Sequence, residues 1–574
     1  MAKFLIGVLT GIILLGLFLV IAVFALARMR EKPPAVADGS TLVLDLEGEI
    51  PERAPVEFPI PFLQRRTPLS VADVWGTLRK ATTDGRIRAI IFEPRDLSIG
   101  WGKLEEIRAD LENFRKSGKP IYAYLKTPTA REYYLATAAS RVYMESEDEL
   151  NLKGMRFELM YFKKTLDKLG IQVEMEHAGK YKDFGDMFTR TNMSPETKEV
   201  LNSVIDDLYG NLIKHIAEAR KRPAAEIRAT IDDGPFLSPQ AREKGLIDGL
   251  LYEDQMLDEV KTKLNAGDLK KISFRDYLKV PVPASGPDGK QQIALVTGEG
   301  GITRGGDGSE FAADAGIGSE EFVKLLRRVG SDGDIKGVIV RVDSPGGEVF
   351  ASDAIWREMN LLSKKKPMVI SMSDTAASGG YYIAMTGDPI VAYPGTFTGS
   401  IGVVFGKANL HGLYDKLGVS KELLSRGRFA DIDSDYQPLS PAGRDKLRSA
   451  MDDNYRSFVT KVAEARRRKF DQIEPLAQGR VWLGSQAKAN GLVDELGGLD
   501  RALELVKQKA RIPRGQRVSL VPYPPKRSVF DILFGQTAES AMESRLGGLF
   551  KGWRLRLWAR GGMMRLMPYT IEIH

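Results

Sequence analysis

The chain has 574 residues, of which 43% are hydrophobic and 28% are charged, and its formal net charge is +7 at pH 7. This length allows two or three domains, and the modest charge, with no zinc-finger or RNA-binding signature, gives no reason to expect nucleic acid as a partner. The absence of cysteine excludes disulfides, thiolate metal sites and cysteine nucleophiles, and four scattered histidines make a histidine-rich metal site improbable. We therefore expect neither a metal nor a cofactor.

The first predicted element is a membrane-spanning helix. Residues 4–27 form an uncharged apolar run that is long enough to cross a bilayer and longer than the hydrophobic part of a typical cleaved signal peptide. We expect an uncleaved anchor over residues 1–30 and a soluble body behind it. Basic residues flank the run on both sides, so the flanking charges do not settle its orientation.

The remainder of the chain contains one sequence pattern twice. KLGV at residues 416–419 matches KLGI at residues 168–171, an offset of 248 residues, and the same offset aligns two Tyr-Tyr pairs. Self-similarity of this kind indicates a duplicated fold. The predicted parts are an N-terminal repeat over 40–265, a linker rich in proline and glycine over 266–290, a C-terminal repeat over 291–512 and an extension over 513–574 that lies outside both repeats.

Each repeat alternates apolar strands with amphipathic helices. In the C-terminal repeat the strand-like runs QIALVTG, GVIVRVDS and PMVISMSD alternate with the helix-like runs SEEFVKLLRRVGSD and VFASDAIWREMNLLSKK. Continuous apolar strands separated by helices favour βαβ units and a parallel sheet covered on both faces. The predicted class is α/β, with two tandem repeats of parallel sheets flanked by helices.

The two repeats differ at residues that can carry chemistry. Ser400, in the stretch TGSIG, aligns with Leu152, whereas Lys182 aligns with Ala430. A serine hydroxyl needs a neighbouring base to act as a nucleophile, and a lysine acts as a base only where burial lowers its pKa. A lone lysine is usually solvated. The difference between the repeats therefore makes Lys182 only a modestly better candidate for the base than the other lysines.

The sequence SPGG lies at the end of the strand-like run GVIVRVDS and precedes a predicted helix. Its two glycines, Gly346 and Gly347, expose backbone N–H groups near a helix N-terminus, where such donors can stabilise an oxyanion. An ordinary strand-to-helix turn explains the same residues, so the motif by itself leaves both interpretations open.

Five segments together resemble the signal peptide peptidase A family, also called protease IV, in its long, duplicated bacterial form. They are VRVDSPGGEVFASD, SDTAASGGYYIAM, TFTGSIGVV, GKYKDFGDMFTRTNMSPE and GLVDELGGLDRA. The resemblance extends from the anchor to about residue 512. It implies a serine endopeptidase with a Ser–Lys dyad on a crotonase/Clp-protease-like fold.

The resemblance also implies roles for particular residues. The nucleophile of the family falls on Ser400, and its base falls on Lys182 rather than Lys180. The further assignments are Gly346, Gly347 and Ile401 as oxyanion-hole donors and Ser425 as the residue that orients the lysine.

Further expectations follow from the resemblance. The family degrades cleaved signal peptides and other apolar peptides, forms ring-like homo-oligomers such as tetramers, and resides in the bacterial inner membrane with its body in the periplasm. The extension, in which Trp553 and Trp558 lie among arginines, suits a membrane interface or a neighbouring subunit.

Three alternatives stay open at the level of sequence. Within proteases, Ser378 in AASGG could be the nucleophile, with His411 as its base. The chain could also be a membrane-tethered scaffold that binds peptides without cutting them. An acyl-CoA enzyme of the crotonase type is the third alternative, although its acidic catalytic residues are not evident.

Overall fold

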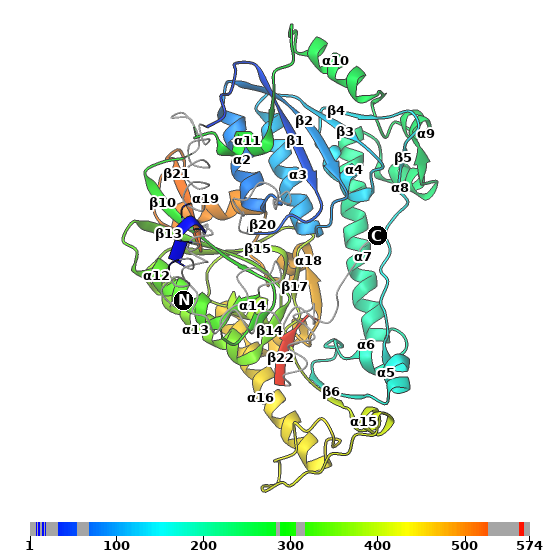
Figure 1. Ribbon diagram of the computed structural model, residues 1–574, viewed down its shortest axis with the longest axis vertical. Helices are drawn as coiled ribbons and strands as arrows, with labels where there is room; N and C mark the ends of the chain where they lie inside the picture. The colour runs from blue at the N-terminus through cyan, green and yellow to red at the C-terminus, as the bar shows by residue number, and fades with distance from the viewer. Residues whose placement is uncertain are drawn as a thin grey trace.

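Two largely parallel sheets, one from each repeat, form the centre of the structure (Figure 1). This computed structural model describes residues 33–53, 68–282, 288–305, 316–525 and 562–567, with scattered positions between residues 7 and 18. The fold is mixed α/β and duplicated, as the sequence predicts. No helix within these described residues is long and apolar enough to cross a membrane. Most of the predicted anchor lies outside the described residues.

The sheet of the N-terminal repeat has six parallel strands in the order β8-β4-β3-β2-β1-β9. Its strands are β1 (Ser40–Glu47), β2 (Ile87–Arg95), β3 (Ile121–Leu125), β4 (Arg141–Met144), β8 (Gly249–Leu250) and β9 (Lys271–Ser273), and β5 (Glu149–Leu150) pairs separately with β7 (Phe236–Leu237). Its helices are α2 (Val71–Thr83), α3 (Trp101–Lys116), α4 (Ala130–Ala136), α5 (Lys163–Leu169), α6 (Asp186–Thr189), α7 (Pro195–Arg220), α8 (Ala224–Asp232), α9 (Ser238–Glu243), α10 (Glu253–Lys263) and α11 (Phe274–Lys279).

The sheet of the C-terminal repeat is built in the same way, in the order β19-β17-β15-β13-β10-β21, with β16 and β20 beside β15. Its strands are β10 (Gln291–Glu299), β13 (Ile335–Ser344), β15 (Met368–Ala377), β16 (Ile390–Ala392), β17 (Phe397–Gly399), β19 (Val481–Leu483), β20 (Glu495–Leu496) and β21 (Val518–Tyr523). Its helices are α12 (Ser319–Ser331), α13 (Val349–Lys365), α14 (Gly379–Ile383), α15 (His411–Leu417), α16 (Pro441–Ala465), α17 (Phe470–Ile473), the 3-10 turn Glu474–Leu476, α18 (Gly484–Asn490) and α19 (Leu499–Lys509). The three strands and two helices predicted for this repeat are all present.

The duplication is visible element by element. Helices α5 and α15 lie 248 residues apart and each ends on a glycine in the left-handed conformation, Gly170 and Gly418. Each sheet also ends on an equivalent parallel strand, because β9 pairs with β1 and β21 pairs with β10. Beyond the predicted ends of the repeats at residues 265 and 512, β9 thus extends the first sheet and β21 extends the second.

A buried ionic network joins the two repeats. The Arg341 guanidinium on β13 donates to Glu52 of the N-terminal repeat over 3.0 and 3.1 Å and also contacts Glu106 on α3. Asp374 at β15 accepts hydrogen bonds from the backbone of Gly100 and Lys103 at the start of α3. Removing one partner of such a buried set leaves an unpaired charge, so the network holds the repeats in one relative position.

A third, mixed sheet crosses from one repeat to the other, in the order β12-β11-β14-β22-β18-β6. Its strands are β6 (Gln172–Ala178), β11 (Ile302–Thr303), β12 (Ile317–Gly318), β14 (Gly346–Glu348), β18 (Val403–Asn409) and β22 (Gly562–Leu566). Strand β6 pairs antiparallel with β18 along its whole length. The extension is therefore not wholly outside the repeats, since β22 is an inner strand of this sheet (Figure 1).

Candidate active site

Pairing between β6 and β18 brings Lys182 and Ser400 together. Lys182 follows the end of β6, and Ser400 lies between β17 and β18. The register pairs Ala178, the last residue of β6, with Val403, the first residue of β18. Lys182 and Ser400 lie just beyond this pair and therefore meet, although they are 218 positions apart in the sequence. A segment of the N-terminal repeat thus supplies the lysine to a site built by the C-terminal repeat.

The Lys182 amine has three close neighbours. Its Nζ atom lies 2.8 Å from Ser400 Oγ, 2.8 Å from the Ser400 carbonyl oxygen and 2.8 Å from Ser378 Oγ. All three residues are fully buried. Two glycines make room for the lysine: a Cβ on Gly479 would lie 2.6 Å from Lys182 Cβ, and a Cβ on Gly402 would lie 3.1 Å from Lys182 Cδ.

Burial lowers the pKa of Lys182 well below its ordinary value, because the charged ammonium loses its hydration. The adjacent Asp183 carboxylate opposes this shift, and the Arg565 guanidinium adds to it. A lysine in this environment becomes a neutral amine at a lower pH than a solvated lysine does, and the neutral amine is the form that accepts a proton.

Both serines adopt backbone conformations that a residue with a side chain rarely takes. The φ angle is +51° at Ser400 and +55° at Ser378. Such strain costs on the order of 1–3 kcal/mol per residue and persists where the surroundings enforce it, as at active sites. Ser400 is fixed by a 2.7 Å hydrogen bond from its N–H to the Arg480 carbonyl, and Ser378 by a 2.8 Å hydrogen bond from its N–H to the Gly399 carbonyl.

The glycine pair lies next to the serines. A Cβ on Gly346 would lie 2.7 Å from the backbone nitrogen of Gly379, and a Cβ on Gly379 would lie 3.0 Å from the nitrogen of Gly347. The nitrogens of Gly347 and Gly379 therefore gather in one place, whereas the Gly346 N–H donates to Ser344 Oγ over 3.2 Å. Clustered backbone N–H groups of this kind form an anion-binding concavity.

The remaining predicted residues lie in different surroundings. Ile401 is buried beside Ser400, and its carbonyl accepts a hydrogen bond from the Gly479 N–H. Ser425 lies in an exposed segment and makes no hydrogen bond to Lys182, whereas Ser378 Oγ lies 2.8 Å from the Lys182 amine. From the sequence, Ser378 is a candidate only as a rival nucleophile; the signal for its place beside the lysine is its position at the end of β15, next to a glycine pair.

The His411 base proposed for Ser378 is not supported by its position. The His411 ring stacks on Tyr436 with a centroid distance of 4.2 Å and lies 3.6 Å from Asp415, on the exposed helix α15. The basic group beside Ser378 is Lys182 instead. The described residues also hold no cluster of three histidine or acidic side chains arranged to bind a metal ion.

The model of Peptidase family S49 matches this chain twice, over residues 113–267 and 360–513. The chain belongs to peptidase family S49. One match lies in each repeat, which confirms the resemblance inferred from the motifs. A Clp protease family model also matches residues 318–396, the segment that carries the glycine pair and Ser378.

Two proteins similar in sequence cover most of this S49 chain. "Serine protease SPPA, chloroplastic" of Arabidopsis thaliana is 35% identical over 87% of this chain and 74% of its own. "Protease 4" of Haemophilus influenzae is 30% identical over 87% of this chain and 84% of its own. Among solved structures, ClpP1 from Listeria monocytogenes covers 36% of this chain and 91% of its own, at 16% identity and a TM-score of 0.22.

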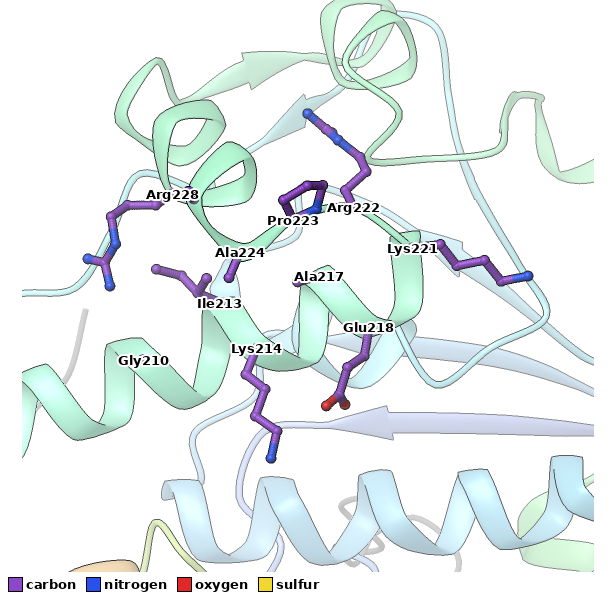
Figure 2. Close-up of a pocket in the computed structure, with 11 residues that line it drawn as sticks. Gly210, Ile213, Lys214, Ala217, Glu218, Lys221, Arg222, Pro223, Ala224 and Arg228 are labelled. Carbon is purple, nitrogen blue, oxygen red and sulfur yellow. The ribbon is translucent and has the colours of Figure 1, made fainter.

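A separate hollow in this S49 chain lies where α7 turns into α8 (Figure 2). Basic side chains surround it, but Figure 2 shows Lys214, Lys221, Arg222 and Arg228 pointing in different directions. Arg222 is engaged by Glu226 and by the Lys244 carbonyl. The hollow therefore lacks the converging polar groups that define a binding site.

Proposed function

We propose that this chain is a membrane-anchored serine endopeptidase that cleaves signal peptides and other apolar peptides, with Ser400 as the nucleophile and Lys182 as the general base. The observation that carries the proposal is the buried Lys182 amine 2.8 Å from Ser400 Oγ. A lysine in this position can activate a serine hydroxyl, which a solvated lysine cannot.

The three neighbours of Lys182 fit the needs of a neutral amine, which has two N–H donors and one lone pair. The Ser400 carbonyl can only accept, so one N–H is directed to it. We assign the second N–H to Ser378 Oγ, which leaves the lone pair for the Ser400 hydroxyl proton. Ser378 is thus a positioning residue that aims the base at the nucleophile.

In this mechanism Lys182 takes the proton of Ser400 as Oγ attacks the peptide carbonyl. The developing oxyanion is stabilised by the backbone N–H groups near Gly347 and Gly379. The tetrahedral intermediate then expels the amine leaving group, which takes the proton from the Lys182 ammonium, and water releases the acyl group with the same lysine as base.

The pH dependence of kcat/KM tests this assignment. The base works as a neutral amine, so activity is present above the pKa of Lys182 and is lost as the pH falls through it. Because burial lowers that pKa well below 10.5, we expect the acid limb of the profile to lie well below pH 10.5. Activity that rises only near pH 10 would show an ordinary, solvated lysine at work and would contradict the proposal.

A scaffold that binds peptides without cutting them is the alternative function. It would need none of the features found here: a buried lysine with a lowered pKa, two strained serines and clustered N–H groups. These features each cost stability, and catalysis is what gives them a use.

We propose the apolar run at residues 4–27 as a single-pass anchor in a bacterial inner membrane, with the soluble body on the periplasmic side. Flotation with lipid vesicles tests the anchor: the full chain should float, and a chain starting at residue 33 should stay in the dense fraction. Equal flotation of both would contradict it.

We also propose that the chain forms a homo-oligomeric ring. Within one chain, β6 of the N-terminal repeat pairs with β18 of the C-terminal repeat. The positions equivalent to these strands, near 155–161 and 420–426, form no named strand in the described part of the chain and expose Met160 by 71% and Leu424 by 96%. A second copy could repeat the pairing there, head to tail. Light scattering that gives the mass of one chain would contradict this.

A further inference from the structure

The C-terminal strand β22 lies beside the active site, between two strands that border it. It runs antiparallel between β14, which carries the glycine pair, and β18, which begins three residues after Ser400. The register sets Gly347 against Arg565, and the Met567 N–H donates to the Pro345 carbonyl over 2.8 Å. A peptide bound as an added strand makes main-chain contacts of this kind.

One backbone group of β22 reaches the clustered N–H groups themselves. The Arg565 carbonyl oxygen would lie only 1.9 Å from a Cβ on Gly346, the same built atom that approaches the Gly379 nitrogen. The carbonyl therefore lies near the Gly379 nitrogen, and the register of β22 sets its residue opposite Gly347. This is the place at which the proposed mechanism puts the carbonyl of a substrate.

Side chains of β22 alternate between two sides of the strand. Met564 and Leu566 are buried in one apolar cluster with Phe184 and Val404. The Arg565 side chain points to the opposite side and enters the C-terminal repeat. An extended segment with apolar residues at alternate positions and one cation between them therefore fits this place between β14 and β18.

Arg565 fills a pocket that we call the arginine pocket, formed by Tyr382, Phe458, Val349 and Asp353. The guanidinium carbon lies 3.7 Å from the centroid of the Tyr382 ring and 5.1 Å from that of Phe458. Its NH1 donates to the Val349 carbonyl over 3.3 Å. Aromatic faces and a carbonyl oxygen together are chemistry that selects a cation.

Asp353 supplies negative charge at the pocket. It accepts a hydrogen bond from the Tyr382 hydroxyl, and its charge acts on the Arg565 guanidinium. It also lies 3.4 Å from Lys461 Nζ, so one carboxylate serves two cations. The pocket is therefore polarised to favour a positive side chain over a neutral one of the same shape.

The fit of Arg565 is incomplete, as expected for an occupant that can leave. Its side chain is 1% exposed, yet its Nε atom has no hydrogen-bond partner among the described residues. Within the same part of the chain, no carboxylate forms an ion pair with it. Burying a cation with unmet hydrogen bonds costs free energy, so β22 is held less firmly than its pairing alone would suggest.

We propose that the arginine pocket is the subsite for a basic side chain of an extended peptide substrate, and that β22 occupies it as a substrate-like strand until a peptide displaces it. The inference rests on the proposed peptidase function, because a peptide bound here is a substrate only if the chain cleaves peptides. Its test measures binding, so its failure is distinct from a failure to cleave.

The test uses the full chain with Lys182→Ala, which prevents turnover, and fluorescein-labelled GMMRLM, the sequence of residues 562–567. A second peptide replaces arginine by citrulline, which has the same shape and no charge. Arg565→Glu is added to weaken the resident strand, and Arg514→Glu, at an exposed position, is the matched control. Thermal unfolding, together with a milder Arg565→Met variant, checks that the fold is intact.

By fluorescence anisotropy, the arginine peptide should bind the Arg565→Glu and Arg565→Met chains about tenfold more tightly than the Arg514→Glu chain. It should also bind about tenfold more tightly than the citrulline peptide, and Asp353→Asn should remove most of that preference. Equal binding of the two peptides, or no gain from either substitution at Arg565, would overturn the proposal.

Discussion

Replacing Lys182 by methionine is expected to reduce kcat for peptide cleavage by about 10³-fold or more, because general-base catalysis contributes on this order. Methionine fills a similar volume without an amine, and Lys182 is fully buried, so the fold should tolerate the change. Hydrolysis of a fluorogenic peptide measures the loss, and thermal unfolding confirms that the variant is folded.

The neighbouring lysine provides a matched control for this experiment. Lys180 is exposed, and its amine lies 3.5 Å from the Tyr181 hydroxyl rather than at a serine. Lys180→Met should therefore keep nearly full activity. If Lys180→Met lost activity and Lys182→Met kept it, the base would be misassigned.

Replacing Ser400 by alanine should abolish cleavage, with a loss of about 10⁴-fold or more, because a nucleophile cannot be bypassed in covalent catalysis. Replacing Ser378 by alanine should lower kcat by about 10- to 100-fold, since the lysine loses one of its three neighbours but keeps the nucleophile. The Ser378→Ala variant should also shift the acid limb of the pH profile, which a purely structural role would not do.

The comparison of these two variants separates the two serines. Both lie 2.8 Å from the Lys182 amine and both have strained backbones, so geometry alone treats them alike. Full activity in Ser400→Ala together with an inactive Ser378→Ala would exchange their roles. It would leave the lysine as the base of a Clp-like arrangement.

Much of the fold could be predicted from the sequence because its signals are local. A βαβ unit is predicted by local patterns alone, without any knowledge of distant residues. Examples are the continuous apolar run Ile335–Ser344 and the amphipathic helix Val349–Lys365. The duplication could also be predicted from the sequence, since equivalent elements keep a nearly constant offset.

The elements that the sequence did not predict are strands whose pairing partners lie far away in the sequence. Strands β9 and β22 are three and five residues long and become strands only through partners far away in the sequence. The sequence predicts GMMRLM as part of an amphipathic segment, because nothing local shows that it enters a sheet. The flanking tryptophans of that prediction lie outside the described residues.

The candidate site was predictable in part for the same reason. The internal comparison pointed to Ser400 and Lys182, because each is missing from the other repeat. Ser378 was not recognised as a neighbour of the lysine, since its role depends on how β15 and β17 lie side by side. Ser425 was selected from the resemblance alone, and the structure places it in an exposed segment.

The central claim, that Lys182 activates Ser400, is tested most directly by locating the acyl-enzyme. The full chain would be incubated with an activated peptide ester, quenched in acid and digested, and the acylated residue identified by mass spectrometry. We expect the acyl group on Ser400, and none in the Lys182→Met variant. An acyl group on Ser378, or one on Ser400 that forms equally well without Lys182, would contradict the account.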